Sequence, residues 1–416
     1  MRIDTGDTAW LLVSAALVLF MSPGLALFYA GMVRRKNVLS TLMHSFSSVP
    51  IVLALWLLCG YGLAFGPTHR GLIGGLGASG VGLERLTSAN HGTVPELAFV
   101  AFQMMFAGIA PALISGAFAE RMKFTTYLAF VALWSLFVYI PMAHWVWADG
   151  GWLAAMGALD FAGGAVIHIT AGVSALVFAK VLGPRLKYPH ERPLPHDLTM
   201  TMTGAGILWF GWFGFNAGSA LSSGHLAALA FVATHLGAAG GVVGWTMVEW
   251  RHRGKPTALG VASGLVGGLV AITPAAGFVA PWAAFLIGVC AGAACYGGVL
   301  LKYRLGYDDS LDAFGVHGVG GFLGAVLTGV FAISALTPGG AKGLLEGDTH
   351  LFIENIIGVV VAAIFSAVVT YVILKVIDKT IGLRVDEEQE AEGLDTATHG
   401  EKGYLFGGAG AMATEE

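Results

Sequence analysis

The sequence predicts an all-α integral membrane protein with eleven transmembrane helices, and three observations support this fold class. Of the 416 residues, 56% are hydrophobic and 12% are charged. An average soluble domain carries about twice that share of charged residues. The mean hydropathy is +0.74. Apolar runs of about 20 residues, long enough to cross a hydrocarbon core, recur along the whole chain.

The first apolar run, residues 8–31, is predicted to be a retained span that starts outside the cell. The preceding segment MRIDTGDTAW lacks the basic region of a signal peptide, and Arg34, Arg35 and Lys36 follow the run instead. Ten further spans are predicted in chain order at residues 38–65, 96–119, 124–146, 162–182, 198–219, 226–250, 258–274, 279–301, 313–335 and 350–377.

Basic residues test this arrangement independently, because cytoplasmic loops carry an excess of Lys and Arg. Only four of the 22 Lys and Arg residues fall on the outer side: Arg2, Arg70, Arg85 and Lys342. Each proposed inner loop is basic, with the sequences VRRKN, ERMKF, PRLKYPHERP, RHRGKP and KYRLG. The pattern predicts an N-terminus outside and a C-terminus inside.

Two segments are polar in character. Residues 66–95 are predicted to form an outer loop, and residues 378–416 an inner tail that follows the transmembrane domain of residues 1–377. The acidic run VDEEQEAEG in the tail fits either a solvated segment or a functional element. The sequence has no G-x-x-x-x-G-K-[ST] loop, so transport would be passive or driven by ion gradients. Neither a metal site nor a nucleic-acid partner is expected.

Two histidines in apolar sequence, His168 and His317, are the leading candidates for a functional site. They are 149 residues apart, and each follows an aspartate, Asp160 or Asp312. In both stretches the order is Leu-Asp, an aromatic residue, glycine, and then Val or Ile beside the histidine. This similarity predicts matched helices in two halves of an internal repeat. Ionisable residues inside a membrane segment are costly and usually functional. Packing residues with satisfied hydrogen bonds, or bis-imidazole ligands of a metal or haem, are the alternatives.

Several motifs resemble the ammonium transporter/methylammonium permease/Rh family, in its bacterial and archaeal ammonium transporter branch. The resemblance runs from about residue 8 to 404, and its motifs read LFYAGMVRRKNVLS, AFQMMFAG, PMAHWVWADGG, LDFAGGAVIHI, GWFGFNAGSA, DAFGVHGVGG and GLRVDEEQEAEGLDTATHGE. The resemblance implies a homotrimer in the cell membrane with one pore per subunit. It also implies two inverted five-helix halves plus one extra helix, with His168 and His317 in the fifth and tenth helices.

The resemblance further implies an outer site that recruits ammonium or methylammonium through Phe106, Trp147 and Ser219. Aromatic faces attract cations through their quadrupoles, and the serine hydroxyl accepts a hydrogen bond. The stretch WVWADGGW is longer than the family pattern, so Trp145 and Trp152 are alternatives to Trp147.

Below this site, the family pattern places Phe215 against Phe106 as the second ring of a gate, with Phe102 and Trp212 lining the neighbourhood. Asp160 fits either a cation ligand or a helix N-cap. The family treats it as a structural residue of the vestibule, and Asp312 is its expected inner counterpart. Glu120 and Glu249 are interpreted as ordinary interfacial charges beside Arg121 and Arg251.

The expected function is therefore ammonium transport for nitrogen uptake, not an enzymatic activity. The pore would recruit NH4+, deprotonate it near the gate, and pass ammonia and a proton separately along the two histidines. A passive ammonia channel and an ammonium sensor with little transport are alternatives. No cofactor is expected. In this family the tail packs under the trimer and helps to form the docking surface of a P-II signal-transduction protein.

Overall fold

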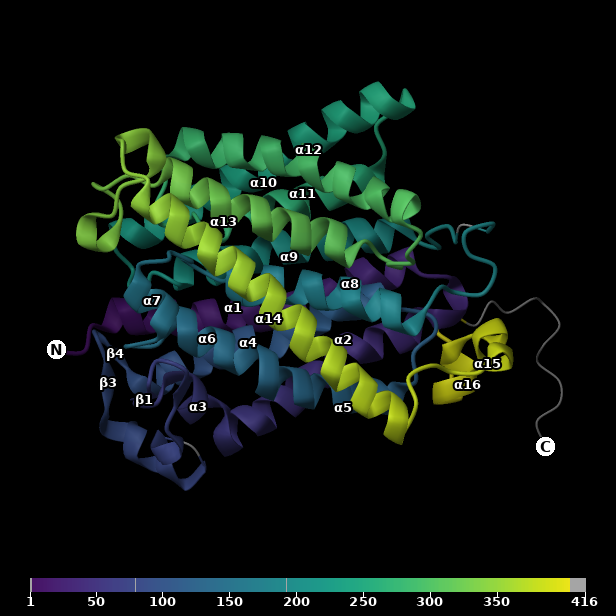
Figure 1. The fold of residues 1–416 in the computed structure, drawn as a ribbon, viewed down its shortest axis with the longest axis horizontal. Helices are drawn as coiled ribbons and strands as arrows, with labels where there is room; N and C mark the ends of the chain where they lie inside the picture. The colour runs from purple at the N-terminus through teal and green to yellow at the C-terminus, as the bar shows by residue number, and fades with distance from the viewer. Residues whose placement is uncertain (1, 79, 192, 405–416) are drawn as a thin grey trace.

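Helices occupy all eleven predicted spans in the computed structural model, which describes residues 2–78, 80–191 and 193–404 (Figure 1). Several spans are built from consecutive helical segments: α1 (Thr5–Met32), α2 (Val38–Leu55) with η2 (Trp56–Gly60) and α3 (Tyr61–Phe65), α4 (Glu96–Ile114) with η5 (Ser115–Ala117), α5 (Phe124–Trp134) with η6 (Ser135–Tyr139) and α6 (Ile140–Trp147), η7 (Gly164–Ile169) with α8 (Thr170–Leu182), α9 (Leu198–Gly218), α10 (His225–Arg253), α11 (Ala258–Ile272), α12 (Pro281–Leu305), η8 (Phe314–Gly318) with α13 (Val319–Phe331), and α14 (His350–Thr380).

Within the described residues, nine helices are long and apolar enough to cross a membrane, which confirms the all-α membrane fold. The two predicted spans outside this set are α9, with 21 residues, and α11, with 15. The start of α1 lies at one end of the bundle and the tail helices at the other (Figure 1), as an odd number of crossings requires. We call these the outer and inner ends. Their orientation in a membrane stays a prediction.

The predicted outer loop is folded into short elements instead of open coil. Two antiparallel hairpins pair Thr68 with Gly74 and Asn90 with Pro95. The elements of this loop and of the other connections are η1 (Arg35–Asn37), β1 (Thr68–His69), β2 (Ile73–Gly74), η3 (Leu76–Ala78), η4 (Gly80–Ser88), β3 (Asn90–His91), β4 (Val94–Pro95), α7 (Trp152–Met156), η9 (Pro338–Gly340) and η10 (Leu344–Glu346).

A close crossing of backbones brings the fifth and tenth spans together. A Cβ built on Gly172 of α8 would lie 2.1 Å from the backbone nitrogen of Gly318 in η8. Only glycine at this position lets the two helices approach so closely, as small residues commonly do in membrane bundles. Because His168 and His317 lie one turn and one residue from these glycines, the crossing determines how near the two imidazoles come.

The tail folds back onto the inner end through α15 (Glu387–Glu392) and α16 (Leu394–His399) (Figure 1). The Arg384 guanidinium donates to Glu390 at 2.7 Å, and Glu390 in turn accepts from the backbone N–H of Leu186 at 2.7 Å. The Asp395 carboxylate accepts from the backbone N–H of Ser40 at 2.8 Å. The tail therefore contacts both an inner loop and the start of α2 in the same chain.

A buried carboxylate, Glu120, joins two inner connections that are distant in sequence. Its two oxygens accept from Arg34 and Arg185, each at 3.0 Å, and Arg185 also pairs with Asp308 at 2.8 Å. The interpretation of Glu120 as an ordinary interfacial charge beside Arg121 is wrong, because its side chain is fully buried and its partners come from other loops. Burial lowers the pKa of Arg121 to about 10, which still leaves this guanidinium charged at neutral pH.

Candidate functional site

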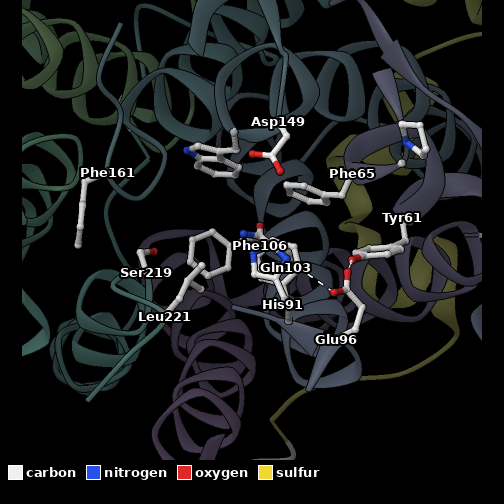
Figure 2. A pocket seen from close by; sticks show the side chains of 14 residues that line it. Tyr61, Phe65, His91, Glu96, Gln103, Phe106, Asp149, Phe161, Ser219 and Leu221 are labelled. Atoms are coloured by element: carbon white, nitrogen blue, oxygen red, sulfur yellow. Dashed lines mark hydrogen bonds and ion pairs between the residues drawn. The ribbon is translucent and has the colours of Figure 1, made fainter. Parts of the chain in front are cut away.

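An outer pocket with a volume of about 480 Å³ is lined by residues from several helices and from the outer loop, and Figure 2 shows it from close by. It brings together the three residues of the predicted recruitment site, Phe106 from α4, Trp147 from the end of α6 and Ser219 after α9. The full lining is Tyr61, Phe65, Gly66, Pro67, His91, Glu96, Phe99, Gln103, Phe106, Trp147, Asp149, Phe161, Ser219 and Leu221.

Trp147, and neither Trp145 nor Trp152, lines this pocket. Its ring lies edge-on to Phe106, with centroids 6.1 Å apart, and its indole N–H donates to the carbonyl of Asp160 at 2.9 Å. Trp145 donates instead to the carbonyl of Leu72. The Ser219 hydroxyl donates to the Phe215 carbonyl at 2.9 Å, which leaves its oxygen lone pairs free to accept from a ligand.

Two stacked phenyl rings close the floor of the pocket. The rings of Phe106 and Phe215 lie 4.2 Å apart at an interplanar angle of 22°, and each side chain is 1% exposed. Phe102 supports Phe106 from the side at a centroid distance of 4.7 Å. A ligand in the outer pocket must displace at least one of these rings to move inward.

Below the stacked rings lies a narrow apolar lumen with a free volume of about 10 Å³. That is near the lower limit for holding one water-sized molecule, about 10–15 Å³. The lumen is lined by Met21, Leu25, Phe28, Ile109, Leu113, Ile167, His168, Leu208, Trp212, Phe215, Val266 and His317. The two imidazoles and the Trp212 indole are the only side chains in this lining that carry nitrogen, and the Trp212 N–H is already donated to Thr273 at 2.9 Å.

The two histidines form a coplanar pair. Their rings are 5.4 Å apart at an interplanar angle of 10°, and the two Nδ1 atoms are separated by 3.3 Å. A hydrogen bond between two Nδ1 atoms requires one donor and one acceptor, so the two neutral rings have opposite tautomers. One Nε2 then carries a hydrogen and the other a lone pair. The Nε2 of His168 has no partner among the described residues.

Both histidines lie in π-helical turns, which are common at functional sites. The outer turn is held by Asp160, whose carboxylate accepts four backbone N–H groups, those of Gly163, Gly164, Ala165 and Val166, at 2.6–3.1 Å. Such a set of bonds occupies the carboxylate fully. Its contacts are therefore those of the N-cap alternative, not of a cation ligand.

The inner turn is held by Asp309 and not by Asp312. The Asp309 carboxylate accepts from the backbone N–H groups of Ala313 and Phe314 at 3.0 and 2.8 Å. Burial raises the pKa of this carboxyl to about 6. Asp312 forms an ion pair with Lys302. The prediction that Asp312 is the inner counterpart of Asp160 is therefore wrong for this capping role.

Three polar residues of the outer pocket, Glu96, Gln103 and Asp149, were not predicted from the sequence. Glu96 lies in the first turn of α4, where an acid is common, and Asp149 lies in the stretch WVWADGGW, so neither stood out as a site residue. Within the described ranges, no group of three or more His, Cys, Asp or Glu side chains is arranged to hold a metal ion.

Together, the apolar helices, the occluded aromatic floor and the histidine-lined lumen define a membrane transport protein with a narrow internal pathway. The sequence profile of the Ammonium Transporter Family matches residues 9–404, and the chain belongs to this family. This result confirms the resemblance seen in the sequence motifs.

Relatives and solved structures support the assignment over nearly the whole chain. An ammonium transporter of Bacillus subtilis is 51% identical, covering 97% of this chain and 99% of the relative. A putative ammonium transporter of Methanothermobacter thermautotrophicus is 49% identical with the same coverage. The crystal structure of Saccharomyces cerevisiae Mep2 has a TM-score of 0.87 at 34% identity, covering 93% of this chain and 89% of Mep2. A structure named Sensor Amt Protein has a TM-score of 0.88 at 29% identity, covering 94% and 98%.

Proposed function

We propose that this protein transports ammonium across the cell membrane. NH4+ binds in the outer pocket against Phe106, Trp147 and Ser219 and loses a proton near the stacked rings. Ammonia and the proton then travel separately along His168 and His317. Methylammonium is expected to use the same path. The family membership and the relatives named ammonium transporters support the substrate.

The observation that carries the mechanism is the hydrogen-bonded histidine pair in an otherwise apolar lumen below a closed floor. Moving an ammonium-sized ion from water into a medium of low dielectric costs of order 20 kcal/mol in the idealised Born estimate. Ammonia is neutral and avoids most of this cost. The remaining proton needs groups that can accept and release it, and two bonded imidazoles provide them.

An ammonium pulse to proteoliposomes, with current and internal pH recorded together, tests this function. The proposal predicts an inward current that scales with the amount of protein. A passive ammonia channel would give internal alkalinisation without current. A sensor would bind ammonium and give neither signal, and either of these two results would contradict the proposal.

Replacing Phe215 with alanine is expected to open the floor of the pocket and to change the ammonium current severalfold, with relaxed selectivity. The ring is buried against Phe106, so the variant removes one half of the stack and leaves a cavity. The matched control is Phe213→Ala, because Phe213 precedes Phe215 by two residues on α9 and stacks on Phe231 outside the lumen lining. A Phe215→Ala protein with normal folding, current and selectivity would exclude a gating role for Phe215.

We further propose that the protein assembles as a homotrimer and that the tail helps a P-II signal-transduction protein to bind at the inner face. The contacts of Glu390 and Asp395 support this role, because they couple the tail to the loop that contains Leu186 and to the start of α2.

Deleting residues 384–416 is expected to weaken inhibition by a P-II protein by at least about fivefold, the low end of common allosteric couplings. Membrane insertion should persist, since the deletion leaves every transmembrane helix intact. Ammonium currents with and without added P-II protein provide the measurement. A deletion of residues 405–416 is the control, because it removes none of the described tail contacts. Unchanged inhibition in the longer deletion would contradict the docking role.

A further inference from the structure

One face of α4 leads from the outer mouth of the pocket down to the aromatic floor. Glu96, Phe99, Gln103 and Phe106 follow a helical spacing of three, four and three residues, and all four line the pocket. Figure 2 labels three of them, Glu96, Gln103 and Phe106. At 1.5 Å of rise per residue, Gln103 lies about 10 Å below Glu96 along the axis, and Phe106 about 5 Å further. The face therefore presents a carboxylate, then an amide, then an aromatic ring.

The lining of this pocket contains acidic residues but no Lys or Arg. Its two carboxylates are those of Glu96 and Asp149. The Asp149 side chain is exposed, and no hydrogen bond or ion pair within the described part of the chain occupies its carboxylate. Asp149 also follows the C-terminal end of α6, where the helix dipole disfavours an acid. Helix stabilisation therefore does not account for a carboxylate at this position.

Glu96 is held in place at the rim. The Tyr61 hydroxyl donates to one of its carboxylate oxygens, and the Nδ1 of His91 lies 3.7 Å from the other. The His91 ring is stacked on Phe99 at a centroid distance of 3.7 Å. These contacts fix a side chain that would otherwise rotate freely in water, and they leave it 15% exposed in the pocket wall.

Gln103 provides an independent sign that a ligand belongs in the pocket. Its side chain is only 8% exposed, and its Oε1 has no hydrogen-bond partner among the described residues. A buried acceptor without a partner is unfavourable and rare in folded proteins. An N–H donor that enters the pocket would satisfy it.

We propose that Glu96 and Asp149 form an outer cation station that collects small ammonium-type cations, and that Gln103 passes them to the aromatic site. The ligand class is a monovalent cation with N–H donors, such as ammonium or methylammonium. The two charges concentrate the cation at the mouth, and the Gln103 oxygen accepts its hydrogen bond as water is left behind. The proposal deepens the transport function stated above and depends on it for its physiological meaning.

The first test measures how ammonium current depends on ionic strength, at about pH 8, where an ordinary imidazole is neutral. At about 10 mM salt, Glu96→Gln with Asp149→Asn should raise the half-saturating ammonium concentration roughly threefold to tenfold, while the maximal current changes less than about twofold. At about 0.3 M salt the difference should disappear, because the screening length is then below 10 Å. The control is Glu84→Gln, which removes an exposed acid of the same outer loop that does not line the pocket.

The second test needs no transport. Quenching of Trp147 fluorescence by Cs⁺ and by iodide, with Trp147→Phe as the blank, reports cation excess inside the pocket. The double variant should lower the Cs⁺ quenching constant roughly threefold at about 10 mM salt and leave iodide quenching equal or higher. If the half-saturating ammonium concentration and the Cs⁺ quenching constant are equal in wild type and double variant, the proposed cation station is wrong. A charge-dependent Cs⁺ signal in a protein without ammonium current would instead support the station and overturn the transport function.

Discussion

Replacing either lumen histidine with alanine will reduce the ammonium-evoked current at least about tenfold per folded protein, as expected when a proton-transfer group is lost. His168 and His317 are buried, and the 3.3 Å bond between their Nδ1 atoms is the only polar link between the two helices inside the lumen lining. In the proposed relay, the loss of one ring leaves the proton released by ammonium without an acceptor in the apolar section. The measurement is current in proteoliposomes after an ammonium pulse.

Acidic replacements of the two lumen histidines test whether these residues exchange protons or only fill space. His168→Asp or His317→Glu keeps a titratable group, but its charged form attracts cations into the lumen. We expect these variants to lose discrimination between ammonium and potassium, measured by ion competition. His44→Ala is the matched control, since His44 is 1% exposed and lies outside the lumen lining, against Tyr127. It should lower stability and leave current and selectivity intact. Unchanged current and selectivity in both lumen alanine variants would refute the relay.

Replacing Gly172 with alanine will abolish most of the current without touching an imidazole. The new methyl group would lie 2.1 Å from the backbone nitrogen of Gly318, against at least 3.4 Å for ordinary contact. The helices must separate, so the bond between His168 and His317 lengthens beyond hydrogen-bond range. Overpacking of this kind costs about 1–3 kcal/mol of stability. Current and thermal unfolding of the purified protein give the two readouts.

Gly297→Ala on α12 is the control for that crossing, because a Cβ there would meet no atom within 4 Å. It should keep the wild-type current and unfolding temperature. A Gly172→Ala protein with wild-type current would show that the histidine pair tolerates a wider crossing, and would weaken its assignment as a bonded relay.

The helices were predictable because apolar length and loop charge are properties of single segments. Each predicted span contains a helix, and the residues of the predicted outer site, Phe106, Trp147 and Ser219, do line one pocket. Their transport roles stay predictions. The folded hairpins between α3 and α4 were not predicted, since their strands have only two residues each and leave no periodic pattern.

The residue that caps the inner π-helical turn was predicted wrongly because the prediction relied on local sequence similarity. Asp312 shares the Leu-Asp pattern of Asp160, but a cap is determined by distance to the helix start. Asp160 and Asp309 each precede their histidine by eight residues, and both accept the N–H groups that open the π-helical turn. Glu120 could not be assigned for a different reason. Its partners Arg34 and Arg185 come from loops that are distant in sequence, and no local sequence pattern predicts such a long-range ion pair.

If the histidine pair relays protons as we propose, its shared hydrogen has a consequence for turnover. A proton can enter at the Nε2 of His168 only when that atom has a lone pair, so that the Nδ1–H of His168 donates to His317. After the proton has crossed and left from the Nε2 of His317, both rings have exchanged tautomers, and His168 cannot accept again. Each transfer therefore ends in a refractory state. In such a pore the time needed to reset the pair, as well as the barrier at the aromatic floor, sets a ceiling on the number of protons carried per second.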